Sequence, residues 1–530
     1  MKRFYFFILL AAVLVTCSSP NVIQPTPSAE VERSWWEEAV FYEIFVRSFY
    51  DSNGDGIGDF NGIAEKLDYL TDLGVNGIWL MPIHPSPTYH GYDVINYFNV
   101  NPQYGTITDF INLLDEAHRR GMHVIIDLVI NHTSNKNPWF VNANSIPNSP
   151  YRNWYIWSET DPGYSSPLGD PWHPGNQGYY YGIFNGGMPD LNYTNPEAGA
   201  KMLQVVQYWL NTIGVDGFRV DAVKYLIEEG EKQENTVSTH NWLENFYITY
   251  KADKPEAFTV GEVWGAGAFA AKTYQNELDE IFSFELAGGF VNSAQGESNT
   301  GMNSAITFTL KDLPDGPYAT FLTNHDQNRV MSVMNGKIDK AKVAAALMLT
   351  SPGTPFIYYG EEIGMEGVKP DEDIRRPMQW NGDANAGFTT GTPWRAPGVN
   401  YTQANVSDET DDPNSLLSFY RTFINLRNQH TALKNGSFSL VNTDNTGVYA
   451  NLRINNSESI LILVNLTKSP ISNYNITLQE AQIQDGSYHL KSLFGQETQS
   501  ELNVVEHAIN NFKPLNDLSA YGIYIFQLEP

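Results

Sequence analysis

Short apolar runs alternate with amphipathic segments along most of the chain. Each run has four to eight mainly apolar residues, and the segments between them carry apolar residues at the spacing of a helix that faces a core. The runs lie at residues 39–46, 77–81, 123–129, 215–221, 258–262, 281–284, 319–324 and 355–359. Eight strands separated by helices predict an α/β protein with a parallel (β/α)8 barrel, the TIM barrel, over residues 35–436.

Two parts of the chain depart from this alternation. Residues 131–196, between the third and fourth predicted strands, are rich in Asn, Pro, Gly, Trp and Tyr and have little periodicity. A loop of this length predicts a small inserted domain. Residues 437–530 hold apolar runs such as 447–454 and 459–464 with turns between them. This pattern predicts a C-terminal antiparallel β-sandwich.

The amino terminus has the features of an export signal. Two basic residues precede an apolar run at residues 4–15, which is too short to span a bilayer as a helix. Cys17 ends a Leu-Val-Thr-Cys sequence that resembles a bacterial lipobox, so residues 1–17 predict a signal with a lipid anchor at Cys17. Residues 18–34 then form a tether. The alternative is an ordinary secretory signal, and both predict a protein exported to the cell surface, the periplasm or the medium.

Charge and composition narrow the choice of ligand. The chain has 32 basic and 60 acidic side chains and a net charge of −28, which would repel a polyphosphate. Nucleic acid is therefore excluded as a partner. Aromatic residues make up 13% of the chain, which suits stacking on a neutral polar ligand such as a sugar. We expect a monomer.

Four carboxylates lie at the ends of predicted barrel strands: Asp127, Asp221, Glu262 and Asp326. Enzymes on this fold keep their reacting groups at the carboxyl ends of the strands. One such residue could be a structural acid, but four at one mouth would repel one another without neighbouring cations. Paired carboxylates indicate glycoside hydrolysis, in which one attacks the anomeric carbon and the other protonates the leaving oxygen. In a retaining enzyme the two lie about 5 to 5.5 Å apart.

Seven short motifs occur in an order that resembles the α-amylase family, glycoside hydrolase family 13. The four strand-end motifs lie at residues 127–132, 217–224, 261–264 and 324–326, and three accessory motifs lie at 77–82, 188–192 and 360–364. The resemblance covers about residues 35–530. It implies a retaining double displacement on α-glucosidic bonds.

The resemblance also implies a role for each carboxylate. Asp221 would be the nucleophile that forms the glycosyl-enzyme, and Glu262 the general acid and then the general base. Asp326 would stabilise the transition state by hydrogen-bonding the distorted sugar. Arg219 would orient and stabilise ionised Asp221, while Asp127 would hold Arg219 and its loop.

Five further residues are implied to bind the sugar. His132 and His325 would bind hydroxyls in the reacting subsite, and Tyr92 would stack beneath that sugar. Asp93 and Arg375 resemble a pair that closes the pocket in family members that attack chain ends. The alternatives are hydrogen bonding within the core for the histidines, packing for Tyr92 and a surface ion pair for Asp93 and Arg375.

Residues 51–59 place oxygen-bearing side chains at alternate positions between glycines, as a hard cation such as calcium requires. The twelfth position is Gly62, where an EF-hand needs a glutamate, so an EF-hand sensor is disfavoured. The pattern resembles a structural calcium loop of the α-amylase family. Its ligands would be the side chains of Asp51, Asn53, Asp55 and Asp59 and the carbonyl of Ile57. An acidic turn is the alternative, and a second calcium site with Asn131 and Asp190 stays open.

The expected activity is cleavage of internal α-1,4 bonds in starch and maltooligosaccharides, as by an α-amylase. Residues 222–224 after the nucleophile and Trp264 after the acid resemble amylases more than α-1,6-cutting relatives. The motifs at 188–192 and 376–380 instead favour an oligosaccharide-specific α-glucosidase or transglycosylase. An inactive sugar-binding protein is disfavoured because all three catalytic carboxylates are present.

Overall fold

The structure is a computed structural model that describes residues 34–265, 267–313, 316 and 318–530. The predicted signal and lipid anchor at residues 1–17, and the tether up to residue 33, lie outside the described residues. One compact unit spans Trp35–Pro530. Within the described residues, no helix is long and apolar enough to cross a membrane.

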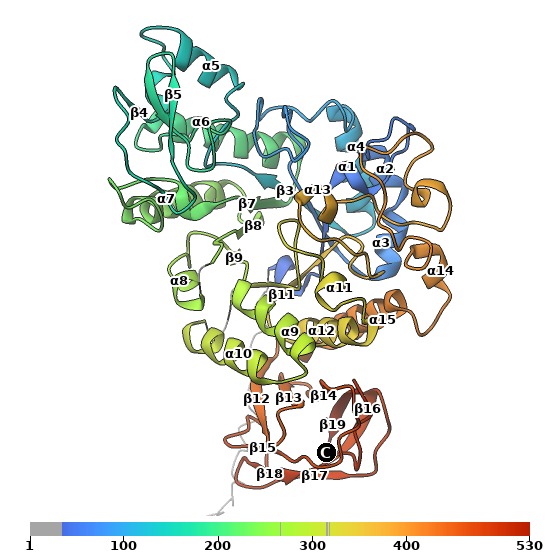
Figure 1. Cartoon of the computed structure of the whole chain (residues 1–530). Coiled ribbons are helices and arrows are strands. Elements are labelled where there is room, and N and C mark those ends of the chain that lie inside the picture. The colour runs from blue at the N-terminus through green and yellow to red at the C-terminus, as the bar shows by residue number, and fades with distance from the viewer. Residues whose placement is uncertain (1–33, 266, 314–315, 317) are drawn as a thin grey trace, which may run out of the picture. The chain divides into compact units, whose positions relative to one another are not determined.

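Eight parallel strands form the central sheet, which confirms the predicted barrel (Figure 1). They are β1 (Phe41–Ile44), β2 (Gly77–Leu80), β3 (His123–Leu128), β7 (Gly217–Val220), β8 (Phe258–Gly261), β9 (Glu280–Ile281), β10 (Ala319–Phe321) and β11 (Thr354–Tyr358). Strand β1 pairs with both β2 and β11. An isolated parallel bridge between Phe282 and Ala319 joins β9 to β10 and closes the ring.

Several strands are shorter than their apolar runs. The run 39–46 continues into α1 (Val46–Phe49), where every residue is buried, and the run 281–284 ends where α9 begins at Phe284. A buried helix start is as apolar as a buried strand, so hydrophobicity alone does not separate the two.

The barrel strands are buried on both faces, which explains their nearly continuous apolar sequences. Their inner face is filled mainly by aromatic rings, including Phe41, Trp79, Phe258 and Phe356. The rings of Phe41 and Phe356 stack with centroids 4.4 Å apart. The outer face packs against the surrounding helices in a larger apolar core.

Helices and helical turns connect the strands and cover the barrel. Those between β1 and β7 are α1, α2 (Phe60–Glu65), α3 (Leu67–Leu73), α4 (Ile107–Arg119), α6 (Pro196–Gln207) and the π-helical turn η3 (Tyr208–Ile213), and η1 (Trp35–Glu38) precedes β1. Those after β7 are η4 (Val223–Tyr225), α7 (Val237–Asp253), α8 (Ala268–Lys272), α9 (Phe284–Gly296), α10 (Thr300–Asp312), α11 (Val330–Val333), α12 (Ile338–Thr350), α13 (Asp371–Ile374), η5 (Ala384–Gly387), α14 (Val406–Thr410), α15 (Leu416–Gln429) and α16 (Thr431–Asn435).

The segment inserted between β3 and β7 forms a small substructure of its own. It contains α5 (Pro138–Ser145), η2 (Arg152–Trp154) and a three-stranded antiparallel sheet. The strands are β4 (Trp157–Ser158), β5 (Trp172–Gly175) and β6 (Gly178–Tyr181). Phe140 packs against the rings of Tyr155, Trp157 and Tyr180, so aromatic residues of the insertion build its core.

The eight C-terminal strands are connected in one antiparallel sheet order, and the sequence predicted antiparallel strands for this region. They are β12 (Ser437–Thr443), β13 (Val448–Ile454), β14 (Ser459–Asn465), β15 (Ile476–Leu478), β16 (Gly486–Phe494), β17 (Glu501–Val504), β18 (Ile509–Phe512) and β19 (Ile523–Glu529). Alternate residues of β14 face two different cores. Leu461 and Leu463 belong to the C-terminal domain's own core, while Ile460 and Ile462 join the core of the barrel and its helices.

Polar contacts also join this domain to the barrel. Arg453 of β13 is buried and donates to the carbonyl oxygen of Thr350, at the end of α12, over 2.8 Å.

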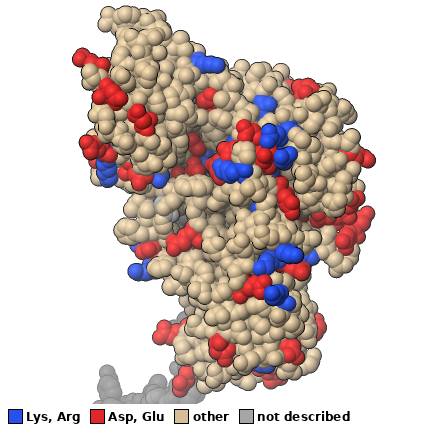
Figure 2. Space-filling model, viewed as in Figure 1, with Lys and Arg blue, Asp and Glu red and all other residues tan. Residues whose placement is uncertain are grey.

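On the face of the molecule in Figure 2, Asp and Glu side chains are spread widely, with Lys and Arg among them.

Candidate active site

The strand-end carboxylates meet at one end of the barrel because parallel strands end on the same side. Asp127 lies in β3 directly opposite Arg219 in the neighbouring strand β7. Asp221 follows β7, Glu262 follows β8, and Asp326 lies in the loop after β10. All five side chains belong to residues that are largely shielded from solvent.

Arg219 lies at the centre of this group. Its Nη1 donates to Asp127 Oδ1 over 2.8 Å and to Asp221 Oδ1 over 2.6 Å. Its Nη2 lies 2.8 Å from Glu262 Oε2. One guanidinium therefore contacts three buried carboxylates and offsets their mutual repulsion. These contacts place Arg219 beside Asp221 and Asp127 as the sequence analysis expected, while the catalytic roles stay predictions.

The carboxylates differ in proton affinity because their surroundings differ. Burial raises the pKa of Asp221 to about 6, against the opposing effect of Arg219. Burial also raises the pKa of Glu262, and the charges of Asp221 and Asp326 add to this increase while Arg219 opposes it. For Asp326 burial acts in the same direction, but His325, Arg375 and Arg219 outweigh it and hold its pKa below the ordinary value. Asp326 is thus ionised while Glu262 retains a proton more readily.

His325 is buried between two acids. Its Nδ1 lies 2.5 Å from Glu43 Oε1, and its Nε2 lies 3.3 Å from Asp326 Oδ2. Tyr92 Oη is 2.6 Å from the same Nε2, and the two rings are nearly parallel with centroids 5.7 Å apart. Sequence reasoning did not single out Glu43. The available signal was one acid within the otherwise apolar run 39–46.

His132 is also held within the site, by one side-chain contact and one backbone contact. Its Nδ1 lies 3.0 Å from Asn131 Oδ1 and its Nε2 lies 3.1 Å from the carbonyl oxygen of Tyr92. Burial lowers its pKa to about 4, so the ring is neutral near neutral pH. The Tyr92 hydroxyl donates to Asp127 Oδ2 over 3.2 Å. Contacts of His132, His325 and Tyr92 with a sugar stay a prediction.

Asp93 and Arg375 do not form the expected pair. Asp93 accepts hydrogen bonds from the hydroxyls of Ser86 and Thr88. Arg375 Nη2 instead lies 2.7 Å from Asp326 Oδ1 and 3.2 Å from Asp371 Oδ2. The alternative of a surface ion pair is also wrong, because Asp93 and Arg375 are both buried. Arg375 was therefore expected at the site, but its observed partners are Asp326 and Asp371 rather than Asp93.

The loop at residues 51–59 wraps tightly, with Gly54 and Gly56 at positive φ. A Cβ on Gly56 would lie 1.9 Å from the carbonyl oxygen of Thr392, so that close approach requires glycine. Asp51 is buried and accepts from three backbone N–H groups of its own loop and from the Thr389 hydroxyl. Asp59 is buried at the N-cap of α2.

The donor chemistry of this loop suits a hard cation, because every candidate ligand is an oxygen. Asn53 and Asp55 are exposed, and each uses one side-chain oxygen to accept one N–H group, which leaves lone pairs free. Across the residues described, no three His, Cys, Asp or Glu side chains are arranged to hold a metal ion. A cation here would therefore also need the Asn53 amide and the Ile57 carbonyl.

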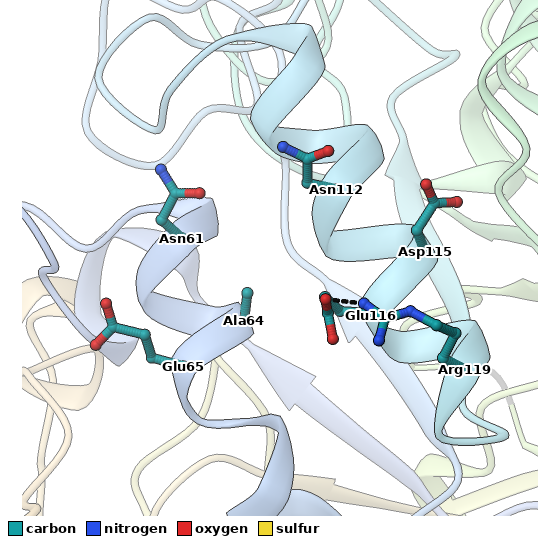
Figure 3. A pocket seen from close by; sticks show the side chains of 7 residues that line it. All are labelled: Asn61, Ala64, Glu65, Asn112, Asp115, Glu116 and Arg119. Atoms are coloured by element: carbon teal, nitrogen blue, oxygen red, sulfur yellow. Dashed lines mark ion pairs between the residues drawn. The ribbon is translucent and has the colours of Figure 1, made fainter.

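A polar groove lies on the outside of the barrel, between α2 and α4 (Figure 3). Its volume is about 680 Å³, and its lining includes Asn61, Glu65, Asn112 and Asp115. Arg119 in its wall is paired with Glu116. None of the candidate catalytic residues lines this groove, so it is separate from the strand-end site.

Comparison with known proteins settles the family. The sequence family described as the catalytic domain of alpha amylase matches residues 43–436. The chain belongs to the α-amylase family. It is 40% identical to Alpha-amylase 3 of Dictyoglomus thermophilum over 456 residues, which cover 85% of this chain and 89% of that protein.

Other members of the α-amylase family are also similar. Oligo-1,6-glucosidase of Parageobacillus thermoglucosidasius is 33% identical over 524 residues, which cover 83% of this chain and 92% of that protein. The crystal structure of an alpha-amylase from H. orenii superposes with a TM-score of 0.80 and 38% identity, and covers 93% of this chain and 99% of the other. The chain is therefore an α-amylase-family glycosidase, and its relatives carry the names of more than one activity.

Proposed function

We propose that this chain is a retaining α-amylase that cleaves internal α-1,4-glucosidic bonds of starch and maltooligosaccharides. The observation that carries the proposal is the placement of Asp221 and Glu262 at the ends of the adjacent strands β7 and β8, joined through Arg219. Two carboxylates at neighbouring strand ends can act on the same anomeric carbon.

The reaction would proceed in two displacements. An ionised Asp221 oxygen attacks the anomeric carbon while the bond to the leaving oxygen breaks and Glu262 transfers its proton to that oxygen. Water, deprotonated by Glu262, then attacks the same carbon and releases Asp221. Asp326 is ionised and accepts hydrogen bonds from sugar hydroxyls. Arg219 contacts Asp221 and Glu262 and balances the negative charge that passes between them.

The second candidate is an oligosaccharide-specific α-glucosidase or transglycosylase on the same fold. It is favoured by the cluster of buried Arg375 with the partly exposed Asp326 and Asp371, which adds fixed charges beside the reacting position and would suit recognition of a chain end. The oligo-1,6-glucosidase relative also favours this candidate.

A time course of products on soluble starch and on maltotriose separates the two candidates. An early mixture of oligomers and a rapid fall in iodine colour would support the endo-acting amylase. Glucose released from maltotriose, with slow attack on starch, would support the α-glucosidase, and longer products would support transfer. The same assays on Glu262→Gln give the background from contaminating enzymes. If Glu262→Gln retained the activity on both substrates, this result would contradict the mechanism.

We also propose that the loop at residues 51–59 binds calcium. Asp51, Asn53, Asp55 and Asp59 would supply side-chain oxygens and Ile57 its carbonyl. A bound cation would add positive charge to an acidic loop and so stabilise its tight wrap. Contacts to the loop from Thr389 and from the backbone N–H of Trp394 would then hold the segment 388–394 against it.

Export and lipid attachment at Cys17 are proposed on the sequence of residues 1–17 alone. Mass spectrometry of the amino-terminal peptide from the native host would detect a diacylglyceryl group on Cys17, and Cys17→Ser would abolish it. A cleaved peptide without lipid would support ordinary secretion. Light scattering of the purified protein tests the expected monomer.

A further inference from the structure

Glu43 is a buried carboxylate in the middle of β1, and none of the proposed catalytic steps uses it. All four residues of β1 are buried, and Glu43 itself is 2% exposed. A carboxylate in such surroundings is costly unless it is paired and hydrogen-bonded. The partner of Glu43 is therefore expected to matter for the site.

That partner is His325. Glu43 Oε1 accepts from His325 Nδ1 at 2.5 Å, and the other ring nitrogen, Nε2, faces Asp326 Oδ2 at 3.3 Å. A neutral imidazole carries one N–H and can donate to only one of two carboxylates, whereas an imidazolium donates to both. Tyr92 Oη also lies 2.6 Å from Nε2, but its one proton is directed to Asp127 Oδ2. The position of the ring between two acids therefore favours the doubly protonated form.

Acids predominate among the titratable and charged groups around His325. Those that face the ring or its backbone are Glu43, Tyr92, Asp127, Glu262, Asp326 and Arg375. Arg375 donates to the carbonyl oxygen of His325 over 2.8 Å and is the one cation among them. Burial alone would lower the pKa of His325, but Asp326 and Glu43 raise it to about 10.

We propose that Glu43 is a positioning residue for the reaction, which keeps the His325 ring doubly protonated and fixes its Nε2 beside Asp326. The inference rests on the proposed glycosidase mechanism. The cation next to Asp326 keeps that carboxylate ionised, so that it can accept hydrogen bonds from the sugar. The ring nitrogen that faces the site then always carries a proton and can only donate.

The charge of His325 is tested directly by NMR of the full-length protein labelled with 15N-histidine. In the wild type we expect one histidine with both nitrogens protonated up to pH 8. In Glu43→Gln, which keeps an acceptor oxygen but removes the charge, this ring should lose one proton below pH 8. In Glu43→Asp, which keeps the charge, it should stay doubly protonated. A neutral His325 in the wild type at pH 7 would overturn the proposal, whatever the enzyme's activity.

The role in the reaction is tested by the pH dependence of kcat/KM on maltotriose. We expect the kcat/KM of Glu43→Gln to fall by about 10-fold or more at pH 8, and by less at pH 6. Losses of this size follow removal of the hydrogen-bond partner that orients a metal-bound histidine. Its alkaline limb should steepen because a second group now titrates there. Glu43→Asp should restore most of the wild-type profile. Equal losses at every pH, or an unchanged profile, would overturn the positioning role.

A matched control is Glu280→Gln in β9, another buried barrel acid, whose Oε1 accepts from Thr354 rather than from a residue of the site. We expect it to leave the pH profile unchanged. If the wild type cleaves no α-glucan, the proposed function fails while the NMR measurement still decides the charge of His325. If the wild type is active and Glu43→Gln behaves like Glu280→Gln, the inference about Glu43 fails alone.

Discussion

Arg219 Nη2 lies 2.8 Å from Glu262 Oε2, so the cation that contacts the proposed nucleophile also contacts the proposed acid. The two contacts have opposite effects on the protonation states that the reaction needs. Pairing with Arg219 favours an ionised Asp221, which the attack requires, but it disfavours the protonated Glu262 that must donate. Burial and the charges of the neighbouring carboxylates offset this second effect and raise the pKa of Glu262. The proton supply of the reaction thus depends on burial of the site.

Removal of the acid should affect substrates according to their leaving groups. We expect Glu262→Gln to lower kcat/KM on maltotriose by at least about 10²-fold, because the sugar oxygen then leaves without a proton. On α-glucosyl fluoride, whose leaving group needs little protonation, the first displacement should be far less affected. Steady-state rates on both substrates measure the difference. An equal loss on both would argue against Glu262 as the proton donor.

Removal of the central cation should shift the acid limb of the activity profile. Burial raises the pKa of Asp221 to about 6 although Arg219 opposes the rise. Arg219→Met should therefore raise this pKa further and move the acid limb of kcat/KM to higher pH. It should also destabilise the protein by about 3–5 kcal/mol, because buried carboxylates lose their partner.

Arg219→Lys is the matched variant, since it keeps the charge but cannot reach three carboxylates in the same geometry. We expect an acid limb between those of the wild type and Arg219→Met. Activity from pH 4.5 to 8 and urea unfolding of all three proteins supply the measurements. An acid limb that stays in place in Arg219→Met would mean that Asp221 does not control it.

Calcium removal should destabilise the protein if the loop at residues 51–59 binds the ion. Asp55 is exposed and accepts one N–H group, from Ile57, so Asp55→Asn changes the apo protein little but removes a charged ligand. A tenfold loss of affinity lowers the stabilisation at saturating calcium by about 1.4 kcal/mol. Calorimetry with calcium and with a chelator measures this change.

Asp161→Asn is the control for that experiment, because Asp161 is also exposed and accepts an N–H group two residues ahead, from Gly163. Its melting temperature should respond to calcium as the wild type does. A wild-type melting temperature that is the same in calcium and in chelator would contradict calcium binding at this loop.

Glu280 should make the stability of the fold depend on pH. Burial raises its pKa from 4.5 to about 8, so the folded chain holds a proton through this interval that the unfolded chain releases. The free energy of unfolding should therefore fall as pH rises from 4.5 to 8, by roughly 1–4 kcal/mol from this group, and then level off. Glu280→Gln lacks this proton, so its stability relative to the wild type should increase over the same interval. Chemical denaturation at pH 5, 7 and 9 tests the sign, and a constant difference would contradict it.

The sequence predicted the barrel and its strand-end carboxylates because both follow from local pattern and order. Asp221 and Glu262 directly follow apolar strands, and parallel strands bring their ends together. The partners of Arg375 could not be predicted in this way, because Arg375 follows the short helix α13 in a long irregular connection whose path depends on tertiary contacts. Glu43 was missed for another reason, since its partner His325 lies 282 residues away and no sequence spacing relates them.

The two-sided burial of β14 limits how this protein can be shortened. A catalytic fragment that ended at residue 436 would lose Ile460 and Ile462 from the core that they share with the barrel, and would lose the Arg453 contact at the end of α12. The barrel surface uncovered in this way would be apolar and prone to aggregation. Recombinant versions should therefore keep the chain to Pro530, and a fused partner or surface tether is best added beyond that residue.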